Sequence, residues 1–133
     1  QNFASTATLK PAIDIANKLN NNKLVENLDS IRDYLLDYFR KDERIRLYGV
    51  PRGTNEEKIP LFSFSVKGVH HEDLALILDK MGVAVRSGQM CAEPLMDRFG
   101  VTGMLRVSFA PYNTLEEAEY FVKCLNKAID MLL

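Results

Sequence analysis

The chain has 133 residues and a mass of 15.1 kDa, which is enough for one domain with a single hydrophobic core and too little for two full domains. Apolar residues make up 47% and charged residues 26% of the sequence, a composition typical of a folded globular chain and not of a disordered one. Its 17 basic and 18 acidic residues give a net charge of −1, so no overall positive field favours nucleic acid or an anionic membrane.

The first third of the chain is predicted to be helical. Apolar residues at three- and four-residue steps predict a helix from about Leu9 to Asn20. A second, longer helix follows, because another apolar stripe is flanked by charged residues on the remaining faces. The residues of this second stripe are Leu24, Leu28, Ile31, Leu35 and Phe39.

Two strands are predicted in the next segment, where the periodicity changes. An apolar run covers Ile45 to Val50, a turn cluster covers Pro51 to Asn55, and a second apolar run covers Ile59 to Lys67. In the second run, two sets of side chains alternate with the two-residue period of a strand that has one buried face. The sets are Leu61, Ser63 and Ser65 on one side and Phe62, Phe64 and Val66 on the other.

Helical spacing returns from His71 to Met81, and Gly82 follows its end. A brief strand at Val83 to Val85 and a helical turn from Pro94 to Phe99 come next. The spacing then predicts a strand from about Met104 to Phe109 and a last helix from Thr114 to Leu132. Thr114 and Glu117 form the capping box of that last helix. Because helices and strands mix and two helices lead, the pattern favours an α+β fold over a doubly wound parallel sheet.

The uncharged stretches and the cysteines bear on the compartment. No run without a charged residue exceeds nine residues, which is far too short for a membrane span. The two cysteines, Cys91 and Cys124, are too few for a disulfide framework, so reduced thiols are expected. We therefore expect a soluble, cytoplasmic protein that binds neither nucleic acid nor a membrane.

Cys91 is the first candidate for chemistry. It precedes Pro94, which suits the start of a helix, and follows Gly88, which permits an unusual backbone conformation. The positive end of a helix and the nearby Arg86 both favour a thiolate, which is the nucleophilic form of cysteine. The alternative is that Cys91 is a small buried hydrophobic residue. We expect that role for Cys124, which lies on the patterned last helix.

Arg106 is the second candidate, because it is a single cation within an apolar strand. A guanidinium binds a carboxylate with two parallel hydrogen bonds, so Arg106 is a candidate for binding an acid group of a substrate. The alternative is an ordinary solvent-facing position of the strand. His70 and His71 are expected to cap a helix or lie at the surface, and we expect no metal site, since neighbouring helical residues point in different directions.

Two motifs lie close together in the second half of the chain. They are Arg-x-Gly-x-x-Cys-Ala-x-Pro-Leu, beginning at Arg86, and Arg-x-Ser-x-x-x-Tyr-Asn-Thr, beginning at Arg106. Together they closely resemble the C-terminal part of the SufS/CsdA-type cysteine desulfurases, which are pyridoxal-phosphate enzymes of the class V aminotransferase family. The resemblance extends more weakly over most of the chain. It implies the small C-terminal domain of a fold type I enzyme, with helices packed on one face of a three- to four-stranded sheet.

The resemblance also implies a reaction. The substrate is L-cysteine or selenocysteine. With L-cysteine, a protein thiolate attacks the sulfur of the substrate, alanine is released, and the protein keeps a persulfide. By motif position, Cys91 is the nucleophile, Arg106 binds the substrate carboxylate, and Arg86 lines the same site. The whole enzyme is expected to be a homodimer that depends on pyridoxal 5′-phosphate and passes sulfur to a SufE-like acceptor or a scaffold protein for iron–sulfur cluster assembly.

The chain departs from the family pattern in two places. Many relatives have His-His before the cysteine, where this chain has Gln89 and Met90. The Ser-x-His-Lys motif, whose lysine anchors the cofactor in the family, has no match, so we expect residues 1–133 to be one domain of a longer protein and to be inactive alone. Two alternatives remain: a class V aminotransferase or lyase that acts on another amino acid, such as cysteine sulfinate, and a noncatalytic module that binds a sulfur-transfer partner.

Overall fold

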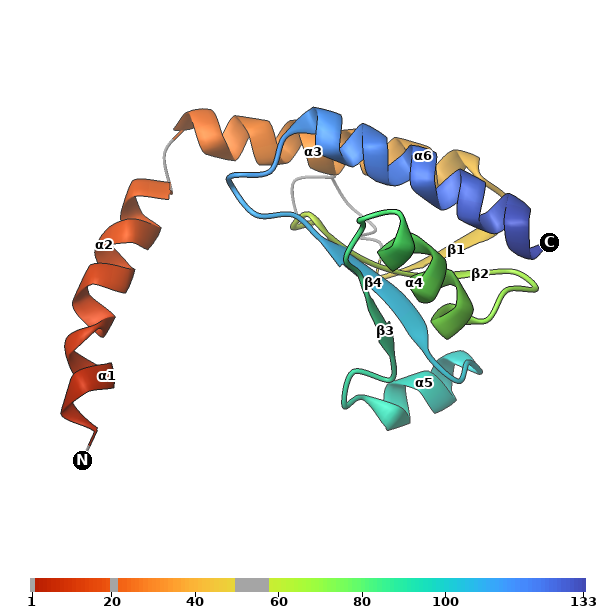
Figure 1. Ribbon diagram of the computed structural model, residues 1–133, viewed down its shortest axis with the longest axis horizontal. Coiled ribbons are helices and arrows are strands. Elements are labelled where there is room, and N and C mark those ends of the chain that lie inside the picture. Colours follow the sequence, from red (N-terminus) through yellow and green to blue (C-terminus); the bar gives the residue numbers. More distant parts are fainter. Residues whose placement is uncertain (1, 20–21, 50–57) are drawn as a thin grey trace.

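The computed structural model describes residues 2–19, 22–49 and 58–133 (Figure 1). Within these ranges the strands form one antiparallel sheet in the order β1-β2-β4-β3. The strands are β1 (Ile45–Tyr48), β2 (Leu61–Val66), β3 (Arg86–Gly88) and β4 (Met104–Ser108). The helices are α1 (Phe3–Ala7), α2 (Leu9–Leu19), α3 (Asn22–Lys41), α4 (His71–Lys80), α5 (Glu93–Phe99) and α6 (Leu115–Leu132). This architecture confirms the predicted α+β fold.

One face of the sheet is closed by α3, α4 and α6 (Figure 1). The alternation predicted for β2 is confirmed, because Phe62, Phe64 and Val66 are buried against these helices. The ring of Phe39 on α3 lies 5.4 Å from that of Phe62 and 5.0 Å from that of Phe64. The core formed this way also includes Ile31, Leu35, Leu74, Leu78, Leu105, Leu125 and Ile129.

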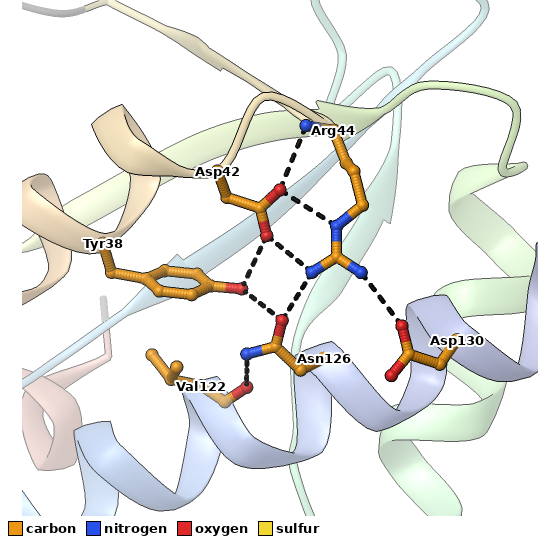
Figure 2. A network of polar contacts seen from close by, with 6 residues as sticks. All are labelled: Tyr38, Asp42, Arg44, Val122, Asn126 and Asp130. Atoms are coloured by element: carbon orange, nitrogen blue, oxygen red, sulfur yellow. Dashed lines mark hydrogen bonds and ion pairs between the residues drawn. The ribbon is translucent and has the colours of Figure 1, made fainter.

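A polar network fastens the end of α3 and the start of β1 to α6 (Figure 2). The guanidinium of Arg44 donates to Asp42 over 2.7 Å, to Asn126 over 2.6 Å and to Asp130 over 2.9 Å. The Tyr38 hydroxyl lies 3.3 Å from Asp42 Oδ2 and 3.2 Å from Asn126 Oδ1. Hydrogen bonds from Arg44 hold the pKa of the Asp42 carboxyl below its usual range, and burial raises the pKa of Tyr38. The charged and polar side chains of the network thus find hydrogen-bond partners within the network.

The opposite face of the sheet is only partly covered, by the short helix α5. Met96 of α5 packs against Tyr48 and Met104, and the rings of Tyr48 and Phe99 are 4.9 Å apart. The remaining positions on this face, where Ser63 and Arg106 lie, are not covered by a helix within the described ranges. The two faces therefore differ in how completely they are closed.

The amino-terminal helices α1 and α2 extend away from the sheet (Figure 1). The helix predicted from Leu9 is confirmed as α2, which ends at Leu19. No residue of α1 or α2 is buried, so the apolar stripe of α2 is exposed, with Leu9 and Ile13 at its surface. In the part of the chain that the structure describes, no helix has the length and apolar character needed to cross a membrane.

The strand predicted at Val83 to Val85 is wrong. Val83 and Val85 pack against the main core without joining the sheet, and β3 forms three residues later, where Arg86 to Gly88 pair with Arg106 to Met104. The alternation of valines thus reflected packing, and strand pairing depended on where β4 could offer hydrogen-bond partners. The turn predicted at Pro51 to Asn55 lies outside the described residues.

Candidate functional site

Arg106 lies in the middle of β4 on the less covered face of the sheet. Its cross-strand neighbours are Ser63 on β2 and Arg86 on β3, so all three side chains leave the sheet on the same side. Like charges directly opposite each other in a sheet repel, and neither guanidinium has a hydrogen bond or an ion pair to any residue within the described ranges. This pair of cations is suited to an anionic ligand.

Arg106 lines a cavity of about 530 Å³ on this face. Its apolar wall is formed by Leu61, Leu95, Met96, Phe99 and Met104. Its polar groups come from Tyr48, Lys58, Ser63, Gln89 and Arg106. No carboxylate is among the described lining residues, and the charged residues among them, Lys58 and Arg106, are cations. A pocket of this size and lining fits a small molecule that combines an acid group with a short apolar part.

Cys91 lies on the loop between β3 and α5 and is exposed, as predicted. The backbone of this loop is unusual. Gly88 has a φ of 106°, and the two consecutive residues Met90 and Cys91 have φ values of 55° and 61°. The left-handed conformation costs a residue with a Cβ roughly 1–2 kcal/mol, so the loop holds its thiol in a conformation that other parts of the structure must maintain.

Helix α5 supplies that support. The backbone amides of Leu95 and Met96 donate to the carbonyl of Ala92 over 2.9 and 3.1 Å, and Met96 is buried in the small core on this face. Pro94 lies in the first turn, where its missing amide hydrogen is not needed, as expected. Gly100 ends the helix with a φ of 67°. The element that follows Cys91 is thus anchored to the sheet.

The structure brings the predicted site residues to one side of the sheet but does not put all of them in the cavity. Met90 and Ala92, which flank Cys91, line the same cavity as Arg106. The interpretation of Arg106 as a solvent-facing strand residue is therefore not supported, because the side chain is half-buried in the cavity wall. Arg86 is exposed on the edge strand and is not among the described lining residues. Cys124, in contrast, is buried in the main core, as expected.

The two histidines have different roles. His70 caps α4 as expected, since its Nδ1 accepts a hydrogen bond of 3.4 Å from the amide of Glu72. For His71 the expected surface or capping role is wrong: its side chain is buried and packs so closely on Gly103 that a Cβ there would collide with the imidazole. Burial and the neighbouring His70 lower the pKa of His71. His71 thus fixes the turn that leads into β4.

Polar residues of the cavity that were not among the predicted candidates include Ser63 and Lys58. Ser63 was assigned to the polar side of its strand, but the sequence does not reveal that it pairs with Arg106. Lys58 is half-buried, its Nζ lies 5.5 Å from the centroid of the Phe62 ring, and burial lowers the pKa of its ammonium. A lysine in a charged segment before a strand carries no signal in the sequence that distinguishes it from a surface residue.

Comparison with known proteins defines the class to which this fold and site belong. The family model of the class V aminotransferases matches residues 1–121. The chain therefore belongs to the class V aminotransferase family.

Within that family, the chain is similar to cysteine desulfurases, which confirms the resemblance inferred from the motifs. It is 37% identical over 131 residues to a probable cysteine desulfurase of Vibrio cholerae, covering 98% of this chain and 31% of that protein. It is 45% identical over 73 residues to cysteine desulfurase CsdA of Escherichia coli, covering 55% of this chain and 18% of CsdA. The chain thus spans about a third or less of the length of these relatives.

Solved structures agree in fold. The crystal structure of CsdA from Escherichia coli, in an S-sulfonic acid form, matches with a TM-score of 0.71 and 34% identity, over 84% of this chain and 27% of that one. The apo cysteine desulfurase of Thermococcus onnurineus matches with a TM-score of 0.56 and 36% identity, over 83% of this chain and 24% of that one. The sheet and its helices are therefore those of this group of enzymes.

Membership of the class V family implies dependence on pyridoxal phosphate. The described lining of the cavity is suited to an acid group. It contains one guanidinium and one ammonium, from Arg106 and Lys58, and no carboxylate among the described residues. The sequence does not contain Ser-x-His-Lys, the motif whose lysine anchors the cofactor in the family. Among the described residues, the cavity and the loop beside it supply a thiol and cations that bind an acid.

Proposed function

We propose that this chain is the small C-terminal domain of a cysteine desulfurase, in which Cys91 accepts the sulfur of L-cysteine and Arg106 binds the substrate carboxylate. One observation carries the proposal: an exposed thiol lies on a loop whose flanking residues, Met90 and Ala92, line the same cavity as a half-buried arginine without an acidic partner among the described residues. The similarity to cysteine desulfurases supports it.

Arg106 fixes the orientation of the substrate. A bidentate guanidinium–carboxylate pair sets the position and the plane of the acid group. The apolar wall of the cavity, which includes Leu61 and Met104, makes the surroundings of this pair less polar and so strengthens it. When its acid group is held, the substrate amino acid is oriented, and so is its sulfur. The exposed loop with Cys91 lies on the same side of the sheet. Arg86, which is paired with Arg106 on the adjacent strand β3, adds positive charge on the same side of the sheet.

The sulfur transfer is balanced by the release of alanine. The thiolate of Cys91 forms a bond to the sulfur of L-cysteine, and the bond between that sulfur and Cβ breaks. The electron pair of the broken bond stays with carbon, which takes up a proton, so that L-cysteine becomes L-alanine and Cys91 becomes a persulfide. Covalent catalysis of this kind requires an accessible thiol, and the exposure of Cys91 supports that role.

The remainder of the whole protein completes the enzyme in this proposal. It holds pyridoxal phosphate, and it forms a homodimer. The persulfide on Cys91 then passes to a sulfur-acceptor protein, SufE-like or a scaffold, that serves iron–sulfur cluster assembly. Exposure of the loop supports transfer to a second protein, because the terminal sulfur of a persulfide there is open to attack from outside.

Alanine release by the full-length protein tests the proposal. The purified protein with pyridoxal phosphate is incubated with L-cysteine and a reducing thiol, and L-alanine is quantified for wild type, Cys91→Ser and Cys124→Ser. Wild type and Cys124→Ser are expected to release alanine at similar rates, and Cys91→Ser to lose at least about a thousandfold in rate. Retention of the cysteine reaction by Cys91→Ser would contradict the assignment. Retained selenocysteine cleavage alone would instead favour a lyase.

A further inference from the structure

Ser63 is the nearest cross-strand neighbour of Arg106 within the cavity. The two residues are directly paired between β2 and β4, and both line the cavity. Directly opposed residues have Cβ atoms about 4.5–5.5 Å apart. A carboxylate accepts hydrogen bonds at two oxygens, each with two lone pairs, so one group can be held by a guanidinium and a hydroxyl on adjacent strands. The geometry therefore puts a second donor beside the guanidinium.

The hydroxyl of Ser63 is available for such a bond. Among the described residues it has no hydrogen-bond partner. Ser65 provides the contrast on the same strand and the same side of the sheet, because its hydroxyl lies 3.0 Å from that of Tyr48 and it does not belong to the described lining of the cavity. Two serines with the same strand environment thus differ in whether the hydroxyl is already used.

The surroundings of Ser63 favour an anion. Arg106 and Lys58 both line the cavity, and they are the charged side chains among its described lining residues. Leu61 and Met104 line the same cavity and make part of its wall apolar, which strengthens a hydrogen bond to a charged group. A serine hydroxyl in this position gains most when the ligand is a carboxylate.

We propose that Ser63 is a substrate-binding residue that donates a second hydrogen bond to the carboxylate held by Arg106. This inference rests on the proposed function, because it takes the ligand of Arg106 to be the acid group of an amino acid. The bond is made equally in substrate and product, since the carboxylate does not react. Ser63 therefore affects the KM of L-cysteine and the affinity of L-alanine, and leaves kcat unchanged.

The test compares Ser63→Ala, the conservative variant Ser63→Thr and the matched control Ser65→Ala in the full-length protein with pyridoxal phosphate. Binding of L-alanine and of L-alaninamide, in which a neutral amide replaces the carboxylate, is measured by calorimetric titration. A hydrogen bond to a charged group is worth about tenfold in affinity. Ser63→Ala is expected to weaken L-alanine binding about tenfold, with little change for L-alaninamide. Ser63→Thr and Ser65→Ala are expected to bind L-alanine like wild type.

The outcomes separate this inference from the proposed function. Equal L-alanine affinity in Ser63→Ala and wild type, equal losses for acid and amide, or an equal loss in Ser65→Ala would overturn the role of Ser63, and so would a wild-type protein that binds no L-alanine. Wild-type protein that binds L-alanine through Ser63 but releases none from L-cysteine would overturn the desulfurase function and leave the role of Ser63 intact. An increase in the steady-state KM for L-cysteine in Ser63→Ala, at constant kcat, supports both the role of Ser63 and the desulfurase function.

Discussion

The two faces of the sheet are built from the same strands, but they differ in which charged groups they leave without a partner. The face beneath α3, α4 and α6 is closed by aromatic and aliphatic side chains, and the polar network next to it pairs its own charges (Figure 2). The opposite face carries the half-buried Arg106 and the exposed Arg86, with no acidic partner within the described ranges, and a loop with two left-handed residues.

The difference indicates that the closed face mainly stabilises the domain and that the open face carries the candidate site. Closed packing stabilises the domain and makes its thiol, Cys124, inaccessible. The open face holds like charges and a backbone conformation that lower stability, which is typical of sites built for a ligand. Perturbing the closed face should therefore reduce stability, and perturbing the open face should alter reactivity or binding.

The largest expected effect is on the closed face. Phe64→Ala removes a fully buried ring that packs on Phe39 and Phe121, and it is expected to lower the free energy of unfolding by about 4 kcal/mol. Leu61→Ala, on the cavity side of the same strand and half-buried, is expected to cost about 1 kcal/mol. Urea unfolding measures both. Similar losses for the two variants would contradict the contrast between the faces.

The next effect concerns the two cysteines. Iodoacetamide labelling of the native protein, followed by peptide mass spectrometry, is expected to modify Cys91 at least about a hundredfold faster than Cys124, because the buried thiol reacts only after local opening of the core. In urea the two rates are expected to converge. Equal rates in the native protein would mean that Cys91 is not presented as the structure has it.

A smaller loss is expected in the polar network. Asp42→Asn removes the carboxylate that accepts from Arg44 and should cost about 2 kcal/mol at neutral pH. Because the folded pKa of Asp42 is depressed, its contribution is present above the unfolded pKa and disappears as the pH falls through the folded pKa. The variant and wild type are therefore expected to converge in stability at acid pH.

Asp37→Asn is the matched control for this network. Asp37 lies on the same helix and pairs with Lys41 over 2.6 Å, but both side chains are exposed. An exposed pair of this kind contributes about 0.5 kcal/mol or less. A loss in Asp37→Asn as large as that in Asp42→Asn would show that the enclosed network has no special role.

The smallest effect is expected in the thiol loop. Met90→Gly removes the penalty of a left-handed residue and is expected to raise the free energy of unfolding by about 0.5–1 kcal/mol. Gln89→Gly, at a neighbouring position without a positive φ, is expected to lower it, because glycine gains freedom in the unfolded chain. Thermal unfolding of both variants measures the difference, and a destabilised Met90→Gly would argue against strain in the loop.

Much of the fold follows from local patterns in the sequence. The stripe of α3, the alternation of β2 and the capping box of α6 each report a periodicity or a local hydrogen bond, so the sequence predicts them correctly. The predicted position of the third strand is wrong, because the partner strand decides which residues pair. Val83 and Val85 have the pattern of a strand, but β4 pairs instead with the more polar residues that follow.

The candidate site was predictable to a similar degree. The motif located Cys91 and Arg106, and the structure puts the first on an exposed loop and the second in a cavity wall. Ser63 was not predictable as a partner of Arg106, since the register between β2 and β4 is a tertiary property. The burial of His71 depends in the same way on Gly103, a residue distant in sequence.

Mass spectrometry of the thiols after reaction with L-cysteine is the most direct test of the central proposal, that the open face carries out sulfur transfer. The full-length protein with pyridoxal phosphate is treated with L-cysteine without a reductant, alkylated and digested. The proposal predicts one additional sulfur atom on the peptide that contains Cys91, and none on the peptide that contains Cys124. An unmodified Cys91 peptide from protein that releases alanine would contradict it.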